Sequence, residues 1–322
     1  MDQVILAAIA VVGVPAVLVG YILVTERLLL FAPERRQRLL RPWIWLAPAL
    51  LFLVVFLVYP TVYTFILSFQ NSPGTQFVGL ANYQYFFGPT GGLGALKNSV
   101  LWLVFFSGIA VSLGLLIAIL VDRVRFESIA KTTIFVPLAI SFVGAGVIWS
   151  FMYAYQTPPA SQTGLLNAVA TALGGDPIAW IVNHTVNNPA LISVGIWMWT
   201  GFCMVILSAN LKSISQELLE AARVDGADEW QVFRRIILPL LMPTVYVVGT
   251  TMIITALKTF DIVYVMSNGR FDTDVIANLM YKEMFVNNQF GRASAVAVIL
   301  LLAIVPFMVL NIRRFREQEA IR

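Results

Sequence analysis

The sequence is poor in residues that carry chemistry. It holds one cysteine, Cys203, and one histidine, His184, among 322 residues. A single cysteine excludes an intrachain disulfide and a cysteine-rich metal cluster. The chain also lacks a G-x-x-x-x-G-K-[ST] phosphate loop, an H-E-x-x-H motif and a serine-centred nucleophile elbow, so ATP hydrolysis of that kind and the common hydrolase chemistries have no support. We interpret His184, in a polar loop, as an ordinary surface residue.

Charge is scarce as well. Only 12% of the residues are charged, whereas 59% are hydrophobic, and a soluble domain carries about 25% charged residues. The mean hydropathy is +0.83, and apolar runs of bilayer-crossing length recur along the chain. These features predict one all-α, polytopic membrane domain rather than two soluble domains.

Seven segments are long and apolar enough to span a bilayer, which takes about 20 helical residues. The first has no basic region before it and no small-x-small cleavage site after it, so we expect a retained span rather than a signal peptide. Pro48 and Pro60 are expected to kink or shorten the second. The predicted spans are residues 4–24, 43–69, 99–121, 129–153, 189–210, 243–266 and 293–312.

The connections between these segments alternate in charge. Sixteen Lys or Arg residues fall in 25–42, 122–131, 211–242 and the tail from 313, whereas 70–98, 154–188 and 267–292 hold four together. The positive-inside rule makes the first set cytoplasmic, with the N-terminus outside and the C-terminus inside. The isoelectric point near 9.3 is therefore explained by topology within membrane lipid, and no nucleic-acid partner is expected.

The outer loops mix glycine, proline, asparagine and aromatic residues. Examples are Asn71–Gly92 and Tyr155–Gly164, whose composition favours turns and short interfacial pieces. They are either a docking surface for an external component or an aromatic belt at the membrane surface.

The cytoplasmic loop before the sixth span is polar yet strongly patterned, and it predicts two short helices and a turn. Ser215 is placed to cap the first helix, and Gly226 to end it with a positive φ. Asp228 with Gln231 three residues later resembles a capping box for the second helix. Pro239 is expected to stop that helix before the next span.

Helical spacing gives each short helix an apolar face. The first face comprises Leu218, Ala221 and Ala222, and the second comprises Trp230, Phe233 and Ile237. Two such helices make a compact knob in which the alanines allow close approach of another backbone. The alternative is an amphipathic segment that lies on the lipid headgroups.

The same stretch carries a family signature. "EAARVDGADEWQVFRRIILP" fits the pattern Glu-Ala-Ala, three residues, Gly, nine residues, Ile-x-Leu-Pro, at Glu220, Ala221, Ala222, Gly226, Ile236, Leu238 and Pro239. This resembles the EAA signature of the membrane subunits of binding-protein-dependent ABC importers. Five further stretches resemble the carbohydrate-importing branch of that family, in which the maltose and alpha-glucoside permeases fall: Phe77–Phe87, Lys97–Trp102, Phe135–Trp149, Ile196–Leu207 and Ala256–Gly269. The likeness covers roughly residues 43–315.

The resemblance implies a type I importer permease, with a core of six spans preceded by one extra N-terminal span. Residues 1–42 would hold that extra helix and a basic cytoplasmic linker, and residues 43–322 the permease domain with its coupling loop at 212–242. In the family this loop is a coupling helix seated in a cleft of a cytoplasmic ATPase. The ATPase binds ATP and Mg²⁺, so the resemblance implies no cofactor and no catalytic or metal site for this chain.

The resemblance also implies partners. These are a second homologous permease, two ATPase subunits, an external solute-binding protein and a sugar substrate, of di- or oligosaccharide size. The location implied is a bacterial or archaeal cytoplasmic membrane. One departure is the outer loop after the sixth span, where "NGRFDTD" (Asn268–Asp274) replaces the Gly-Gly-Pro common in the family, which leaves the delivery surface open.

Several residues of the fifth and sixth predicted spans are candidates for a substrate pathway. Lys258 is the basic residue inside a span, and Asp261 follows three positions later on the expected helical face. An ion pair or snorkelling of these two toward the outer end explains them equally well. Aromatic and hydroxyl groups that suit a sugar are Trp197, Trp199, Thr200, Thr255 and Thr259. The alternative for these is helix packing, with each threonine bonded to its own backbone.

Other functions remain open from the sequence. The same machinery could import glycerol phosphate, a polyol or a peptide. A protein of another class would be a membrane anchor or receptor whose knob docks a signalling partner. A secondary transporter is disfavoured, because the spans lack paired acidic relays and a repeat of broken helices.

Overall fold

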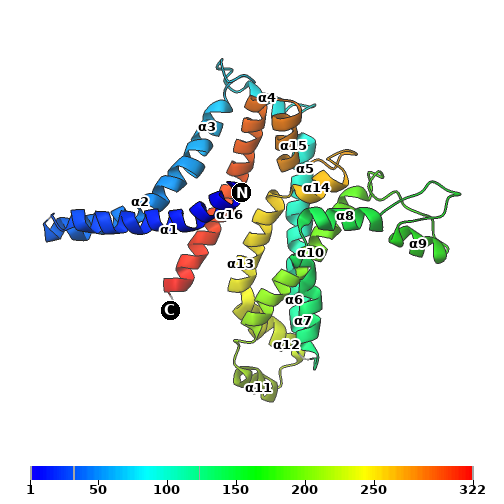
Figure 1. The fold of residues 1–322 in the computed structure, drawn as a ribbon. Helices are drawn as coiled ribbons and strands as arrows, with labels where there is room; N and C mark the ends of the chain where they lie inside the picture. Colours follow the sequence, from blue (N-terminus) through cyan, green and yellow to red (C-terminus); the bar gives the residue numbers. More distant parts are fainter. Residues whose placement is uncertain (1, 32, 123, 321–322) are drawn as a thin grey trace. The chain divides into compact units, whose positions relative to one another are not determined.

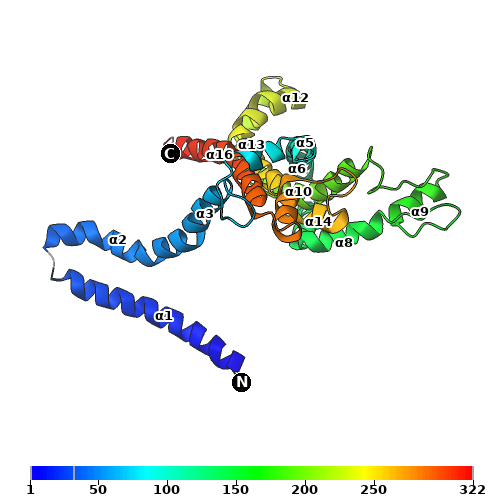
Figure 2. The ribbon, with the colours of Figure 1, turned by 90° about the horizontal axis from the view of Figure 1, so that it is seen from above.

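The computed structural model describes residues 2–31, 33–122 and 124–320 (Figure 1; seen from above in Figure 2). All regular structure in these ranges is helical apart from one isolated bridge between Gln70 and Phe77, which confirms the predicted all-α class. The chain divides into two compact units, residues 1–64 and 65–322.

The first unit is a helical hairpin. Helix α1 (Asp2–Leu29) is followed by α2 (Glu34–Leu53), a π-helical turn (Val54–Val58) and the start of α3 (Tyr59–Leu67). Glu26 joins the two arms, because it accepts hydrogen bonds from Arg41 Nη2 at 2.9 Å and Trp45 Nε1 at 3.0 Å. Much of the stretch expected as a basic linker is therefore helical, although the division of the chain at residue 42 stays a prediction.

The second predicted span is longer than expected. It is one continuous helix from Glu34 to Leu67, and Pro48 and Pro60 do not shorten it. The π-helical turn Val54–Val58 lies just ahead of Pro60. A π turn already departs from regular i to i+4 bonding, so it accommodates the proline's missing N–H.

The second unit holds the remaining helices. In chain order these are α4 (Ala81–Phe86), α5 (Leu93–Leu101), a π turn (Trp102–Phe106), α6 (Ser107–Val121), α7 (Glu127–Phe135), a 3₁₀ turn (Val136–Ala139), α8 (Phe142–Met152), α9 (Leu165–Ala172), α10 (Asn187–Leu211), α11 (Gln216–Val224), α12 (Glu229–Val232), a π turn (Phe233–Ile237), α13 (Leu238–Leu257), α14 (Asp261–Met266), α15 (Ile276–Tyr281), a π turn (Lys282–Val286) and α16 (Phe290–Ala320). Six helices in the described ranges are long and apolar enough to cross a membrane, or seven if one bent pair counts as a span. The predicted number of spans is thus confirmed within that range.

Helix α10 forms the centre of the core. It packs against α6, α7 and α13, and residues on every side of it are buried. Small residues permit this: a side chain at Gly114 of α6 would collide with Cys203 of α10, and one at Gly201 would collide with the Ile134 carbonyl. Close approach at small residues is how helices associate in lipid, where burial against other helices gains little hydrophobic energy.

The fourth predicted span is bent rather than straight. Helices α7 and α8 meet at 100°, so the single span predicted over 129–153 is wrong in shape. The 3₁₀ turn carries Pro137, whose ring cannot continue an α-helix. Ser141 then starts α8, and its Oγ accepts a hydrogen bond of 3.0 Å from the Gly144 amide.

The sixth predicted span is interrupted near its C-terminal end. Helix α13 ends at Leu257, and Asp261 starts α14 after three residues outside both helices. Lys258 and Asp261 therefore do not share the face of one continuous helix, as the i, i+3 spacing predicted. No proline or glycine marks the break, so the apolar pattern gave no sign of it.

Candidate functional site

The loop between α10 and α13 lies at one end of the second unit, and α4 and α15 lie toward the other (Figure 1). It is built as the sequence predicts at its turn. Gly226 has φ +87°, its amide donates to the Arg223 carbonyl at 3.0 Å, and the chain reverses there. Asp228 and Gln231 form the predicted capping box, with a bond of 2.8 Å from the Gln231 amide to Asp228 Oδ1. Ser215 precedes α11, but its side chain makes no capping bond.

Ion pairs stabilise this loop at two places, across its turn and at its base. Arg223 Nε donates to Glu229 Oε1 at 2.8 Å across the turn, and this bond raises the pKa of Arg223. At the base, Lys212 lies 2.6 Å from Glu127 Oε1, and Lys131 bonds both Glu127 and Ser208. The base of the loop is thus tied to the start of the bent span α7–α8.

The helix that follows the turn does not end at Pro239, so that expectation is wrong. Residues Glu229–Leu257 form one continuous helix through the π turn Phe233–Ile237. Pro239 falls in the first turn of α13 directly after that π turn. The missing proline N–H is therefore absorbed where the bonding pattern already changes.

The predicted apolar face of α11 is divided between the interior and the surface. Leu219, 8% exposed, and Ala222 pack against the cluster of Leu211, Val232 and Ile237. Leu218, predicted to share one apolar face with Ala221 and Ala222, points outward and is 46% exposed. Leu218, Ala221 and Val224 instead form an exposed apolar stripe at i, i+3, i+6 spacing, with Val224 87% exposed.

The second predicted face is also only partly correct. Trp230 and Phe233 are in ring contact at 5.5 Å, and Ile237 is buried. However, the fully buried anchor of this helix is Val232, which the helical spacing did not single out.

The remaining positions of the signature divide between surface and interior. Glu220 and Pro239 are exposed, Ile236 packs against the same buried cluster, and Leu238 is half-buried. The signature therefore combines residues that build the loop with residues that the loop presents.

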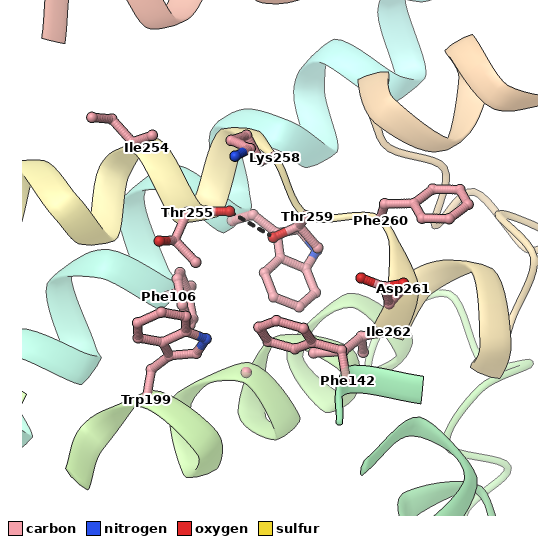
Figure 3. Close-up of a pocket in the computed structure, with 12 residues that line it drawn as sticks. Phe106, Phe142, Trp199, Ile254, Thr255, Lys258, Thr259, Phe260, Asp261 and Ile262 are labelled. Carbon is pink, nitrogen blue, oxygen red and sulfur yellow. Dashed lines mark hydrogen bonds between the residues drawn. The ribbon is translucent and has the colours of Figure 1, made fainter. Parts of the chain in front are cut away.

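A cavity of about 350 Å³ lies among α10, the α13–α14 break and the start of α8 (Figure 3). Its lining residues are Trp102, Phe106, Phe142, Gly195, Trp199, Ile254, Thr255, Lys258, Thr259, Phe260, Asp261 and Ile262. Its walls are mainly aromatic: Phe142 stacks on Trp199 at 6.2 Å, and Trp102 touches Phe106 at 5.8 Å.

Five of the seven predicted pathway residues line this cavity: Trp199, Thr255, Lys258, Thr259 and Asp261. The other two do not. Trp197 packs edge-on against Trp149 at 5.7 Å, and Thr200 is buried with its hydroxyl donating to the Ile196 carbonyl at 2.7 Å. Trp197 and Thr200 thus belong to the packing side of α10. The role of all seven in transport stays a prediction.

The cavity threonines also bond their own backbone, as the alternative interpretation expected. Thr255 donates to the Thr251 carbonyl at 2.9 Å, and Thr259 to the Thr255 carbonyl at 3.4 Å. Each hydroxyl oxygen keeps its lone pairs, so both can still accept hydrogen bonds from a ligand.

Lys258 and Asp261 make no ion pair with each other, nor with any residue in the ranges that the structure describes. Lys258 is exposed, and Asp261 is half-buried in the cavity wall. The break at 258–260 thus brings a carboxylate and an ammonium group to the cavity without a partner of their own.

Sequence reasoning missed the aromatic half of the cavity. Trp102, Phe106, Phe142 and Phe260 come from three separate segments, and their nearness depends on the bend of α7–α8 and the break after α13. The indole N–H groups of Trp102 and Trp199 have no acceptor among the described residues. Unpaired buried donors are costly, so a ligand oxygen that reached them would be favoured.

Comparison with known proteins identifies the family. Residues 110–315 match the family model "Binding-protein-dependent transport system inner membrane component". The chain belongs to this family. The expectation drawn from the EAA signature is thus confirmed, and the chain is the permease, a multi-pass inner-membrane component of such a transport system.

Two curated relatives resemble the permease over most of its length. The osmoprotective compounds uptake permease protein GgtC of Synechocystis sp. is 56% identical over 278 residues, which are 86% of this chain and 100% of the relative. The alpha-glucoside transport system permease protein AglF of Rhizobium meliloti is 47% identical over 281 residues, 87% and 84% of the two chains.

A solved structure has the same fold. A chain of a bacterial ABC transporter involved in the import of the acidic polysaccharide alginate superimposes with a TM-score of 0.75 at 23% identity, over 88% of the permease and 99% of that chain. The permease therefore has the fold of a type I importer subunit. The direction in which the termini face stays a prediction from the distribution of charge.

Proposed function

We propose that the permease forms half of the translocation pathway of an ATP-driven importer of saccharides, of di- or oligosaccharide size. A second homologous permease supplies the other half, two cytoplasmic ATPase subunits bind and hydrolyse ATP with Mg²⁺, and an external binding protein delivers the sugar. The permease itself is non-catalytic and transmits the ATPase motion through its coupling loop.

The observation that carries this proposal is the exposed stripe Leu218, Ala221 and Val224 on α11. Apolar side chains that project from an otherwise polar loop indicate a protein contact. The stripe is held in a fixed orientation by the Gly226 turn, the capping box and the Arg223–Glu229 bond. Because the support is rigid, a displacement of the stripe moves α13 with it.

The cavity supports the substrate class. Aromatic walls stack against the C–H face of a pyranose ring, and Thr255, Thr259 and Asp261 offer hydrogen-bond groups at its edge. The relative AglF is named for alpha-glucosides, so disaccharides with an α-glucosyl unit are the first substrates to test.

Osmoprotective compounds are a second candidate substrate class, because the relative GgtC is named for them. Trehalose and sucrose are saccharides that also protect against osmotic stress, whereas glycine betaine is an osmoprotectant without a hydroxyl group. Uptake of the first two but not of glycine betaine supports the saccharide proposal.

The ATPase contact is tested by crosslinking in the assembled complex. A cysteine in place of Ala221, with Cys203 replaced, should crosslink to the ATPase, whereas Gln216→Cys on the other side of α11 should not. Lipid-accessible labelling at 221 without a crosslink would instead place α11 on the headgroups and would refute the docking role.

The substrate proposal is tested in proteoliposomes that contain both permeases and the ATPase, with the binding protein added outside. The probes are radiolabelled maltose, sucrose and trehalose, with glycine betaine for comparison. ATP-dependent uptake of at least one saccharide is expected, and uptake of glycine betaine alone would contradict the proposal.

A further inference from the structure

Four aromatic rings lead away from the cavity toward the end of the second unit that holds α15. Phe260 lines the cavity and also stacks on Tyr264 at 5.1 Å. Tyr281 contacts Phe260 at 5.2 Å and Tyr264 at 5.1 Å, and Phe285 contacts Tyr281 at 5.0 Å. We call Phe260, Tyr264, Tyr281 and Phe285 the aromatic ladder.

The ladder joins two stretches of the chain, residues 260–264 and 281–285. Phe260 lies in the break after α13, Tyr264 in α14, Tyr281 at the end of α15, and Phe285 in the π turn that follows. In Figure 3, the Phe260 ring points away from Trp199 and Phe106, out of the cavity. The break that creates the cavity therefore also turns Phe260 toward the other three rings.

The four rings differ in exposure, and Phe285, the last of them, is the most exposed. Phe260 and Tyr281 are half-buried, Tyr264 is 38% exposed and Phe285 is 66% exposed. A group of four rings with an exposed outer member is unusual for a surface that only faces water. At its other end the ladder reaches the cavity, because Phe260 lines the cavity wall.

The ladder also carries polar groups at the edges of its rings. The neighbouring Tyr264 side chain raises the pKa of Tyr281, and the two rings lie 5.1 Å apart. Asp261 and Lys258 lie beside Phe260 in the cavity wall. Ring faces with hydroxyl groups at their rim suit a pyranose, whose C–H face stacks while its hydroxyls hydrogen-bond.

We propose that the aromatic ladder is an entry subsite for pyranose rings, which captures the released saccharide at the outer end and passes it to the cavity. This inference rests on the proposed function. It commits to the saccharide as the occupant, because the ladder is continuous with the cavity through Phe260 and ends in an exposed ring. A lipid belt or a contact with the second permease is the competing outcome.

The test uses the assembled proteoliposomes and measures saccharide taken up per ATP hydrolysed, with maltose, sucrose and trehalose as probes. Phe285→Ala should lower this ratio about three- to tenfold, as expected when one ring contact is lost, while ATP hydrolysis continues. Phe285→Trp keeps a stacking ring and should restore the ratio. Phe87→Ala is the matched control, because Phe87 is 54% exposed and lies outside the ladder.

The results distinguish an entry subsite from a protein contact and from a failure of the proposed function. An unchanged ratio in both Phe285→Ala and Tyr281→Leu would overturn the entry subsite. A parallel fall of ATP hydrolysis and of the recovery of the permease pair would overturn it in favour of a protein contact. If the unaltered complex takes up none of the three saccharides, the proposed function fails instead.

Discussion

The coupling loop and the cavity lining differ from their surroundings in polarity, and they do so in opposite directions. In the loop, apolar side chains at 218, 221 and 224 face outward from a polar segment, whereas at the cavity Thr255, Thr259 and Asp261 face inward from apolar helices. Each is a departure from its surroundings that folding alone does not require. We therefore expect the proposed ATPase contact and substrate pathway to depend on these two regions.

The two regions also differ in what holds them. The turn of the loop is fixed by short-range contacts: a positive-φ glycine, a capping box and one ion pair across the turn. The cavity depends on long-range geometry, because its walls meet only through the 100° bend of α7–α8 and the break after α13. Changes at the loop should therefore act on coupling, and changes at the cavity on the substrate.

The largest effect is expected from Gly226→Pro. Proline fixes φ near −65° and cannot adopt the +87° found at this turn, so the stripe loses its orientation and uptake should fall to background. Gly174→Pro is the matched control: Gly174 has φ +83° with an amide bond of 3.0 Å to Thr171, but it lies in another loop. Equal losses of uptake in the two variants would show a general folding defect rather than a coupling role.

The next largest effect is expected from Val224→Asp, which places a charge on the exposed stripe. Desolvating that charge at a protein contact should weaken binding of the ATPase about tenfold or more, as measured by co-purification and titration of the two subunits. Gln216→Asp adds the same charge to α11 outside the stripe and should have little effect. ATPase affinity that is unaltered by Val224→Asp would remove the stripe from the interface.

A pair of threonines tests the role of the cavity. Thr255→Val and Thr200→Val each remove a hydroxyl that bonds its own helix, but only Thr255 lines the cavity. Loss of one ligand hydrogen bond should lower the uptake rate about three- to tenfold for Thr255→Val, with a much smaller change for Thr200→Val. The reverse order, measured with the same saccharide, would place the pathway on the other face of α10.

The smallest effect is expected from Glu127→Gln at the base of the loop. The change removes the carboxylate that Lys131 and Lys212 share, but Lys212 is largely exposed and solvent screens such pairs. The melting temperature of the purified complex should fall by about 3 °C or less. If ATP hydrolysis persists while uptake is lost, Glu127 instead transmits motion from the loop to the bent span.

These differences explain how far the sequence alone could lead. The Gly226 turn and the Asp228 capping box depend on residues close in sequence, and both are found as predicted. The burial of Leu219 rather than Leu218 depends on packing against α10 and α13, which helical spacing cannot reveal. The break at Lys258 has no proline or glycine to mark it, so the aromatic half of the cavity could not be assembled from the sequence.

Prolines also show that helix breaks cannot be predicted reliably from the sequence. Pro60 and Pro239 each follow a π turn and leave their helices continuous, although a proline inside a helix ordinarily breaks it. Pro137 does mark a bend, at α7–α8. Pro48 also leaves α2 continuous, although no π turn precedes it, so the residue type alone does not predict a break.

The central claim is that ATP hydrolysis drives saccharide uptake through the coupling loop. It is tested most directly by measuring both quantities in one preparation of proteoliposomes, with the unaltered permease and with Gly226→Pro. The account predicts that uptake requires the ATPase and ATP, resists an ionophore, and is lost in Gly226→Pro while the complex remains inserted. Uptake that continues without the ATPase and collapses with an ionophore would contradict it.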